Sequence, residues 1–324
     1  MDNNKPNVIV IVGPTASGKT SLGINIAKEL DGEIISADSM QIYKGLDIGT
    51  AKATAEEQRK IKHHLIDVCD IEVEFSVYDY KKLCYKKIDE IISLNKVPVI
   101  VGGTGLYINA VVNNMNFDDS VEKNDLSENN IRKELENILS SKGKEYLYNM
   151  LVELDSVAAE KIHMNNTKRV IRAIELAKEG TYKGNIDKRN DLWNRNESSY
   201  NFITIYIDMP RQELYDRINT RVDLMKDSGI IEEAKMLKKM NLPSNSTAIQ
   251  AIGYKEFFDY IDAKETLEDA LERLKQSTRR YAKRQITWFK KLNCDIIFDK
   301  NMNYNELIEN IKRMMYEKRK NDKE

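Results

Sequence analysis

The segment that most restricts the fold of this chain is a loop near the N-terminus, Gly13 to Thr20. It reads GPTASGKT and matches the pattern G-x-x-x-x-G-K-[ST]. A β-branched run, Val8 to Val12, precedes the loop, and a stretch with helical spacing of apolar residues, Ser21 to Leu30, follows it. A strand, a glycine-rich loop and a helix in this order are typical of an α/β fold that binds phosphate. The sequence therefore predicts a parallel sheet whose first strand ends at a phosphate site.

The residue types of this loop suit a bound phosphate. Glycines let the backbone wrap closely around the anion, and the N-terminus of the following helix adds positive dipole. Lys19 adds positive charge, and the Thr20 hydroxyl can hold Mg²⁺ as the metal ligand. The alternative, a chance glycine-rich turn, does not explain why both flanks fit. The residues predicted to bind the phosphates are Gly13, Pro14, Thr15, Ala16, Ser17, Gly18, Lys19 and Thr20.

Further strand and helix patterns extend the α/β prediction, but the chain interrupts them once. Between 117 and 199, polar loops and amphipathic helices replace the strands. We expect an α/β fold, a P-loop core with a parallel sheet flanked by helices (1–116 and 200–324), plus an inserted helical domain (117–199). The predicted strands are Glu33–Ser36, Pro98–Val101, Phe202–Ile207 and Asp295–Phe298, and the predicted helices are Val77–Leu94, Ile131–Leu139, Tyr146–Leu154 and Arg169–Ala177.

Charge and cysteine content bear on partners and location. The 51 Lys and Arg nearly balance the 52 Asp and Glu, so any nucleic-acid site must come from local segregation of charge. The cysteines, Cys69, Cys84 and Cys294, lack the spacing of metal ligands, which favours free thiols in a reducing compartment. The apolar runs are strand-sized and the N-terminus lacks an apolar targeting segment. We expect no membrane association and a cytoplasmic location.

Two more segments are predicted to reach the edge of the sheet where the phosphate loop lies. Asp38 follows the second strand, where a carboxylate can accept a proton or hold a metal, although a structural cap has the same pattern. Gly102 and Gly103 follow the strand that ends at Val101, and a tight turn would also explain them. They stand where a Walker B strand carries an acidic residue. Their presence argues against nucleotide hydrolysis, unless Asp38 substitutes.

Together these segments resemble the tRNA dimethylallyltransferase family, also called tRNA isopentenyltransferases. The resemblance runs in order over nearly the whole chain, and it is weakest in the insertion linkers, at 185–199 and beyond about 300. The segments that match are GPTASGKT at Gly13–Thr20, SADSMQIYKGLDIGTAK at Ser36–Lys52, HHLIDV at His63–Val68, GGTGLYI at Gly102–Ile108, IHMNNTKRVIRAIE at Ile162–Glu175, AIGYKE at Ala251–Glu256 and TRRYAKRQITWF at Thr278–Phe289.

The resemblance implies transfer of a dimethylallyl group from dimethylallyl diphosphate to N6 of the adenosine 3′ of the tRNA anticodon, with pyrophosphate leaving. It implies Asp38 as the general base, Arg221 as an arginine that stabilises the leaving diphosphate, and Thr15 as a contact to its oxygens. The partners would be the tRNA anticodon stem-loop and dimethylallyl diphosphate, and the cofactor would be Mg²⁺. Separately from the resemblance, we expect a monomer. Without the resemblance, Arg217 and Arg221 are four residues apart on a helix and would be interpreted as solvated.

The resemblance also implies two groups of tRNA contacts. For the second group, ordinary solvated helix charges are the alternative. The base-side group is Asp38, Ser39, Met40, Gln41 and Thr104, and the group in the helical insertion is Arg132, Lys168, Arg169, Val170, Ile171 and Arg172.

A helix near the C-terminus supports RNA binding from its own residues. Its basic side chains recur at i, i+4 and can form a stripe for phosphates, and Tyr281, Trp288 and Phe289 could stack on bases. The alternative is that the aromatic residues belong to the core and the charges are solvated. The basic residues are Arg273, Lys275, Arg279, Arg280, Lys283, Arg284, Lys290 and Lys291. The tRNA contacts predicted here are Arg279, Arg280, Lys283, Arg284 and Gln285.

Two other functions remain compatible with parts of the pattern. A small-molecule or nucleotide kinase would use the same P-loop, Asp38 and Mg²⁺ with ATP, but it leaves the basic helix and the insertion unexplained. A non-catalytic RNA-binding protein could keep the P-loop as a relic, but the intact set of Lys19, Thr20 and Asp38 argues against a relic.

Overall fold

The computed structural model describes residues 5–117, 127–178, 192–193, 196–243 and 246–321. The strands are β1 (Asn7–Val12), β2 (Gly32–Ala37), β3 (His63–His64), β4 (Val97–Gly102), β5 (Asn201–Ile207) and β6 (Ile296–Phe298). The helices are α1 (Lys19–Glu29), α2 (Ala55–Lys60), α3 (Val77–Ser93), α4 (Gly105–Val112), α5 (Ser127–Leu154), α6 (Ser156–Lys161), α7 (Thr167–Lys178), α9 (Arg211–Asp227), α10 (Ile230–Lys239), the 3₁₀ helix η3 (Lys255–Phe257), α11 (Phe258–Ile261), α12 (Leu267–Phe289) and α13 (Tyr304–Asn321).

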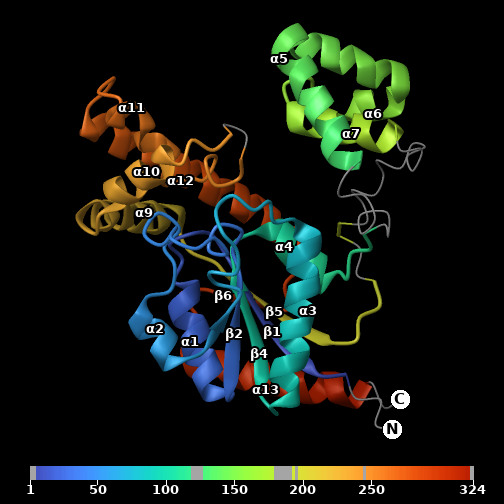
Figure 1. Ribbon diagram of the computed structural model, residues 1–324. Coiled ribbons are helices and arrows are strands. Elements are labelled where there is room, and N and C mark those ends of the chain that lie inside the picture. Colours follow the sequence, from blue (N-terminus) through green and yellow to red (C-terminus); the bar gives the residue numbers. More distant parts are fainter. Residues whose placement is uncertain (1–4, 118–126, 179–191, 194–195, 244–245, 322–324) are drawn as a thin grey trace. The chain divides into compact units, whose positions relative to one another are not determined.

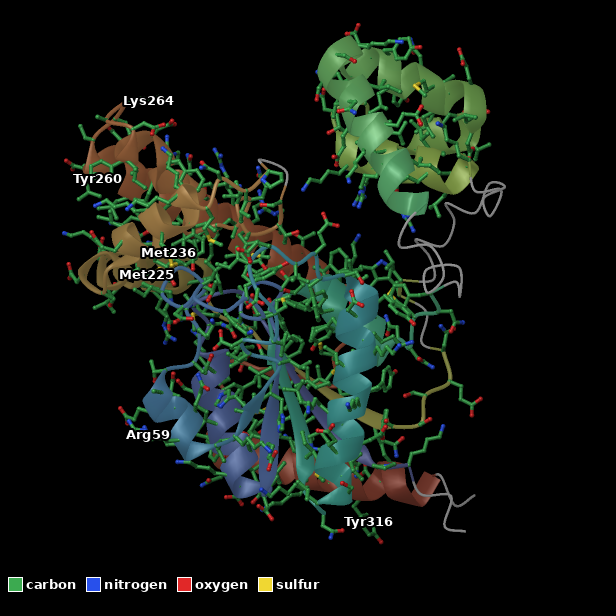
Figure 2. All side chains as sticks on the ribbon, viewed as in Figure 1. Arg59, Met225, Met236, Tyr260, Lys264 and Tyr316 are labelled. Carbon is green, nitrogen blue, oxygen red and sulfur yellow. The ribbon has the colours of Figure 1, made fainter. Side chains whose placement is uncertain are left out.

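The strands form one parallel sheet in the order β3-β2-β4-β1-β5-β6 (Figure 1). Every residue of β1 and β2 is buried, which is expected when helices cover both faces of a parallel sheet. Helices α1 and α13 supply apolar residues to the core on one face, and α3 and α4 pack against each other and the sheet opposite α1 (Figure 1). The predicted α/β fold with a parallel sheet is confirmed.

All four strands predicted after the P-loop occur, with ends shifted by no more than one residue. The sequence did not predict β3, because a strand of two residues, His63 and His64, is too short to show a period. Helix α1 starts at Lys19, two residues before the predicted start, since the P-loop itself forms its N-terminus. Helix α3 begins where predicted because Ser76 and Asp79 form a capping box.

The C-terminal helices build a second apolar core against the chain that follows β2. Buried residues of this core come from α9, α10, α12 and the segment Ile42 to Leu46, and Phe257 and Tyr254 are fully buried within it. Because this core holds the segment after β2 against the helices, it positions residues at the carboxyl end of the sheet.

The chain divides into two compact units, 1–114 with 196–324, and 115–195. The second unit contains α5, α6 and α7 around an apolar core that includes Leu135, Leu151 and Ile174. Gly143, at φ +82°, interrupts α5 between the two predicted helices. The described residues of this unit are helical or in turns, with no strand. The predicted linkers at 118–130 and 184–199 lie largely outside the described residues.

The two crossings between the units lie side by side. The Asn196 amide donates to the Asn113 carbonyl at 3.1 Å, and the Asn114 side chain donates to the Glu197 carbonyl at 2.6 Å. The insertion therefore leaves and rejoins the first unit at one place. Among the helices described, none is both long enough and apolar enough to cross a bilayer.

Candidate active site

A cleft of about 760 Å³ lies in the first unit where the P-loop, Asp38 and the Gly102-Gly103 turn meet. The carboxyl ends of β1, β2 and β4 bring these segments to one edge of the sheet. The loop from Asp47 to Ala55 and the helices α9 and α12 form its other walls. The cleft therefore combines a phosphate-binding loop with a carboxylate and several polar side chains.

The P-loop is folded for anion binding. Ala16 and Gly18 adopt left-handed backbone angles, φ +63° and +87°, which turn the loop into the first turn of α1. The Lys19 ammonium donates to the Pro14 carbonyl at 2.6 Å. Burial, with the Arg221 charge nearby, lowers the pKa of Lys19 to about 7, although the Asp38 charge opposes this. A bound diphosphate would place negative charge beside Lys19 and favour its charged form.

Arg221 faces the P-loop from α9. Its guanidinium lies 3.4 Å from the Thr15 hydroxyl, and burial lowers its pKa. Arg217, one turn earlier on the same side of the helix, is more exposed and pairs with Glu213 at 2.7 Å, and its guanidinium would lie 3.9 Å from a Cβ on Gly18. Arg221 is half-buried and lines the cleft, so it is not a fully solvated helix residue. The structure brings Arg221, Thr15 and Lys19 to one end of the cleft.

Asp38 lies at the end of β2 and lines the same cleft. Burial raises the pKa of Asp38, while the Met40 amide, 2.9 Å away, and the charge of Lys19 act in the opposite direction. The carboxylate thus caps the turn after β2 and also faces the cleft. The capping interpretation is confirmed, and the catalytic interpretation stays a prediction.

The predicted base-side residues converge around Asp38. The Ser39 amide donates to the Thr104 hydroxyl at 2.9 Å, which ties the turn after β2 to the turn after β4. The Gln41 side chain accepts from the Ser36 hydroxyl at 3.0 Å and donates to the carbonyls of Thr50 and Ala51, each at 3.3 Å. These contacts give the segment one position at the cleft wall.

A family model described as IPP transferase matches residues 41–292, which is most of the chain. The chain belongs to this family. Among its relatives, the tRNA dimethylallyltransferase of Acetivibrio thermocellus is 52% identical over 287 residues, which is 88% of this chain and 89% of that protein.

Solved structures of the IPP transferase family support the same assignment. The full-length tRNA isopentenylpyrophosphate transferase of Bacillus halodurans is 42% identical with a TM-score of 0.68, covering 98% of each chain. A eukaryotic dimethylallyltransferase acting on tRNA is 31% identical with a TM-score of 0.76, covering 91% of this chain and 74% of that one.

Gln285 has a structural role that the sequence did not indicate, although it also lines the cleft, and its predicted tRNA contact stays a prediction. Only 5% of it is exposed, and its side-chain amide bonds to two loops of the protein. Its oxygen accepts from the Thr15 amide at 2.8 Å, and its nitrogen donates to the Gly103 carbonyl at 2.9 Å. Gln285 therefore connects α12, the P-loop and the turn after β4. The basic pattern around it gave no sign of this role, since the contact joins residues 270 positions apart.

The basic side chains of α12 differ in their surroundings along the helix. In its first part, Arg273, Lys275 and Arg279 bind the carboxylates of Glu265, Asp223 and Glu272. These contacts argue against the predicted RNA contact at Arg279, whose guanidinium also donates to Asn219 at 2.8 Å. Toward its C-terminal end, Arg280, Lys283, Arg284 and Lys290 are exposed.

The aromatic residues of α12 are packed within the protein, as the core alternative states. The Trp288 indole donates to Asn109 at 3.0 Å, and Phe289 is 1% exposed. Tyr281 differs, because it lines the cleft near Asp38 and Thr104, and burial raises its pKa. The sequence did not single out Tyr281 for the cleft, since its spacing is also that of a core residue.

The predicted contacts in the helical unit also divide into two kinds. Val170 and Ile171 are 1% and 4% exposed in the core of that unit, so they are not available to tRNA, and their prediction is wrong. Lys168 and Arg169 are exposed. Two further arginines, Arg132 and Arg172, each lie 3.1 Å from the buried carboxylate of Glu175.

The absence of an acidic residue after β4 has a steric reason. A Cβ on Gly102 would overlap the Ala37 carbonyl, because β2 and β4 approach closely there. A Walker B carboxylate could not occupy this position without moving the strands. The cleft of this IPP transferase family member is thus built for a phosphate without that carboxylate.

Proposed function

We propose that this protein transfers the dimethylallyl group of dimethylallyl diphosphate to N6 of the adenosine 3′ of the anticodon in tRNA. The observation that carries the proposal is the cleft itself, in which the P-loop and Arg221 lie at one end and Asp38 lies among base-side residues. Membership of the IPP transferase family and the names of its relatives support the same reaction.

The reaction forms a bond between N6 and the allylic carbon of dimethylallyl diphosphate. It breaks the bond between that carbon and the ester oxygen of the diphosphate. The exocyclic amine is a weak nucleophile because its lone pair is delocalised into the ring. Asp38 accepts the amine proton, and the pKa raised by burial makes this carboxylate a stronger base than an exposed one. The electron pair of the broken bond leaves with the diphosphate.

The diphosphate gains negative charge as it leaves, and three groups of this chain stabilise that charge. The P-loop amides and Lys19 surround the phosphates, while Arg221 reaches them beside the Thr15 hydroxyl. Lys19 and Arg221 are both half-buried, and burial strengthens the interaction of their charges with a bound anion.

For Mg²⁺, the Thr20 hydroxyl lines the cleft in the first turn of α1, and Asp38 lines the same cleft. In the part of the chain that the structure describes, no cluster of three or more His, Cys, Asp or Glu would hold a metal by itself. This donor set fits Mg²⁺, which is held by few protein oxygens together with waters and substrate phosphates. When bound, the ion would neutralise charge on the diphosphate.

The proposed tRNA contacts are the base-side residues and the exposed cations Arg280, Lys283, Arg284, Lys168 and Arg169. We expect a monomer acting in the cytoplasm, and light scattering coupled to size-exclusion chromatography tests the oligomeric state.

The test combines purified protein, Mg²⁺, unmodified tRNA and labelled dimethylallyl diphosphate, followed by digestion and identification of the labelled nucleoside. Label on the adenosine beside the anticodon, unaffected by excess ATP, is the expected result. If no label is transferred to tRNA and ATP binds tightly, the transferase proposal is rejected in favour of a kinase.

A further inference from the structure

The loop from Asp47 to Lys52 lines the cleft, yet it belongs to no strand or helix. Such a loop needs contacts from elsewhere to keep one conformation. Those contacts come from α10, which follows α9 after a turn at Gly229, where the backbone is left-handed at φ +98°.

Glu233 of α10 fills a concave row of backbone amides in this loop. Its carboxylate accepts from the consecutive amides of Asp47, Ile48 and Gly49, the last two at 3.0 Å each. Successive amides that point to one side form a site for an anion, and here a carboxylate of the protein occupies it. Hydrogen bonds to a charged acceptor are stronger than neutral ones.

The same loop also packs against the segment AIGYKE. A Cβ on Gly49 would lie 2.5 Å from a ring carbon of Tyr254, and a Cβ on Gly253 would lie 2.8 Å from the Gly49 carbonyl oxygen. Tyr254 is fully buried. The loop is thus held by hydrogen bonds to Glu233 and by close packing against Tyr254, and both reach Gly49.

The fixed loop in turn holds Gln41. The amide nitrogen of Gln41 donates to the carbonyls of Thr50 and Ala51, which directly follow the amides that Glu233 binds. The side-chain oxygen accepts from Ser36, at the end of β2 beside Asp38. Movement of the loop would therefore release Gln41 from two of its three side-chain contacts.

We propose that Glu233 is a positioning residue for the nucleobase, acting through loop 47–51 to hold Gln41 at the cleft wall. The inference rests on the proposed function, since it assumes that a base lies against Gln41. The hairpin of α9 and α10 then serves both substrates, because Arg221 on α9 faces the diphosphate end and Glu233 on α10 fixes the base end.

The test is a double-mutant cycle with Glu233→Gln, Gln41→Ala and the double variant. The matched control is Glu232→Gln. Glu232 lies in the same turn, its side chain is 71% exposed, and it pairs with Lys235 at 3.3 Å on the surface. The readouts are kcat/KM for an anticodon stem-loop RNA, Kd for dimethylallyl diphosphate, and Tm.

We expect Glu233→Gln to lower kcat/KM for the RNA by about tenfold to a hundredfold, because small displacements of positioning groups have effects of this size. Kd for dimethylallyl diphosphate stays unchanged, and Glu232→Gln behaves as wild type. The double variant is no worse than Gln41→Ala alone. Losses that multiply in the double variant would overturn the inference.

Two further controls separate other outcomes. If Glu233→Gln does not fold, Glu233→Asp, which keeps the charge but withdraws it by one methylene, enters the same cycle. A wild-type protein that transfers no label to RNA would contradict the proposed function, whereas an active wild type with multiplicative losses contradicts only the role of Glu233.

Discussion

At the scale of single residues, the cleft places two ionisable groups in environments that disfavour their charged forms. Burial raises the pKa of Asp38 and lowers that of Lys19 to about 7. Each group would be expensive in an ordinary core. A raised pKa suits Asp38 to accept a proton from an amine. A lowered pKa suits Lys19 to regain its charge when a negative diphosphate binds beside it.

Replacement of Asp38 by Asn should separate catalysis from stability. We expect kcat to fall by about 10² to 10⁴, the usual contribution of a general base, with Kd for dimethylallyl diphosphate retained. The raised folded pKa means that ionised Asp38 disfavours folding at neutral pH, so the Tm of Asp38→Asn should rise. Calorimetry and single-turnover assays test both, with the exposed Asp70→Asn as control. A variant with unchanged kcat would exclude Asp38 as the base.

The lowered pKa of Lys19 predicts that the protein takes up a proton when diphosphate binds. In the free protein its pKa of about 7 leaves it mostly neutral at pH 8, and an anion favours the ammonium form. Affinity should therefore weaken as pH rises above about 7. Isothermal titration at pH 8 in two buffers of different ionisation enthalpy measures the uptake, after correction for titration of the ligand itself. Wild-type binding without uptake, or uptake that persists in Lys19→Arg, would contradict the assignment to Lys19.

At the scale of elements, α12 carries two groups of cations with separate roles. The group nearer its N-terminus forms ion pairs, for example Lys275 with Asp223 at 2.7 Å. The group nearer its C-terminus, Arg280, Lys283 and Arg284, is exposed. Sequence spacing alone does not distinguish these groups, because basic residues recur at i, i+4 through both.

Neutralising the two groups of cations should give different results. Arg280→Gln, Lys283→Gln and Arg284→Gln should each weaken tRNA binding and reduce the salt slope of log K by about 0.7 to 0.9, with Tm unchanged. Arg273→Gln should instead lower stability by about 1 kcal/mol without changing the slope, since its partners are Glu265 and the Glu256 carbonyl. Equal salt slopes for variants of both groups would contradict this division.

At the scale of the whole molecule, the balanced charge of −1 gives no general attraction for RNA, so affinity must come from particular surfaces. The helical unit, 115–195, has its own apolar core, and the two residues that flank it, Asn114 and Asn196, are hydrogen-bonded to each other. Such an insertion is replaceable without stretching the remaining chain.

Replacement of 115–195 by a short Gly-Ser linker should leave dimethylallyl diphosphate binding intact, because every residue of the cleft lies in the other unit. We expect weaker tRNA binding and a smaller salt slope, since Lys168 and Arg169 are removed. Fluorescence anisotropy with labelled tRNA checks this. Unchanged tRNA affinity would mean that the unit serves another purpose.

The sequence alone determined the α/β class, the P-loop and the carboxylate at the end of the second strand. These features are local, because a strand, a glycine-rich turn and a helix start are each encoded within a few residues. Family resemblance supplied the roles of Arg221 and the base-side segment, which periodicity did not indicate.

Only the tertiary structure decided which charged and polar residues face the cleft, solvent or each other. Arg217 and Arg221 lie one turn apart on α9, yet Arg217 pairs with Glu213 and Arg221 reaches the Thr15 hydroxyl. Gln285 connects loops that lie far apart in the chain. Glu233 had no local signal at all, since its partners are amides more than 180 residues away. Helical and strand periods specify the face a side chain takes on its own element, and packing between elements specifies what that face meets.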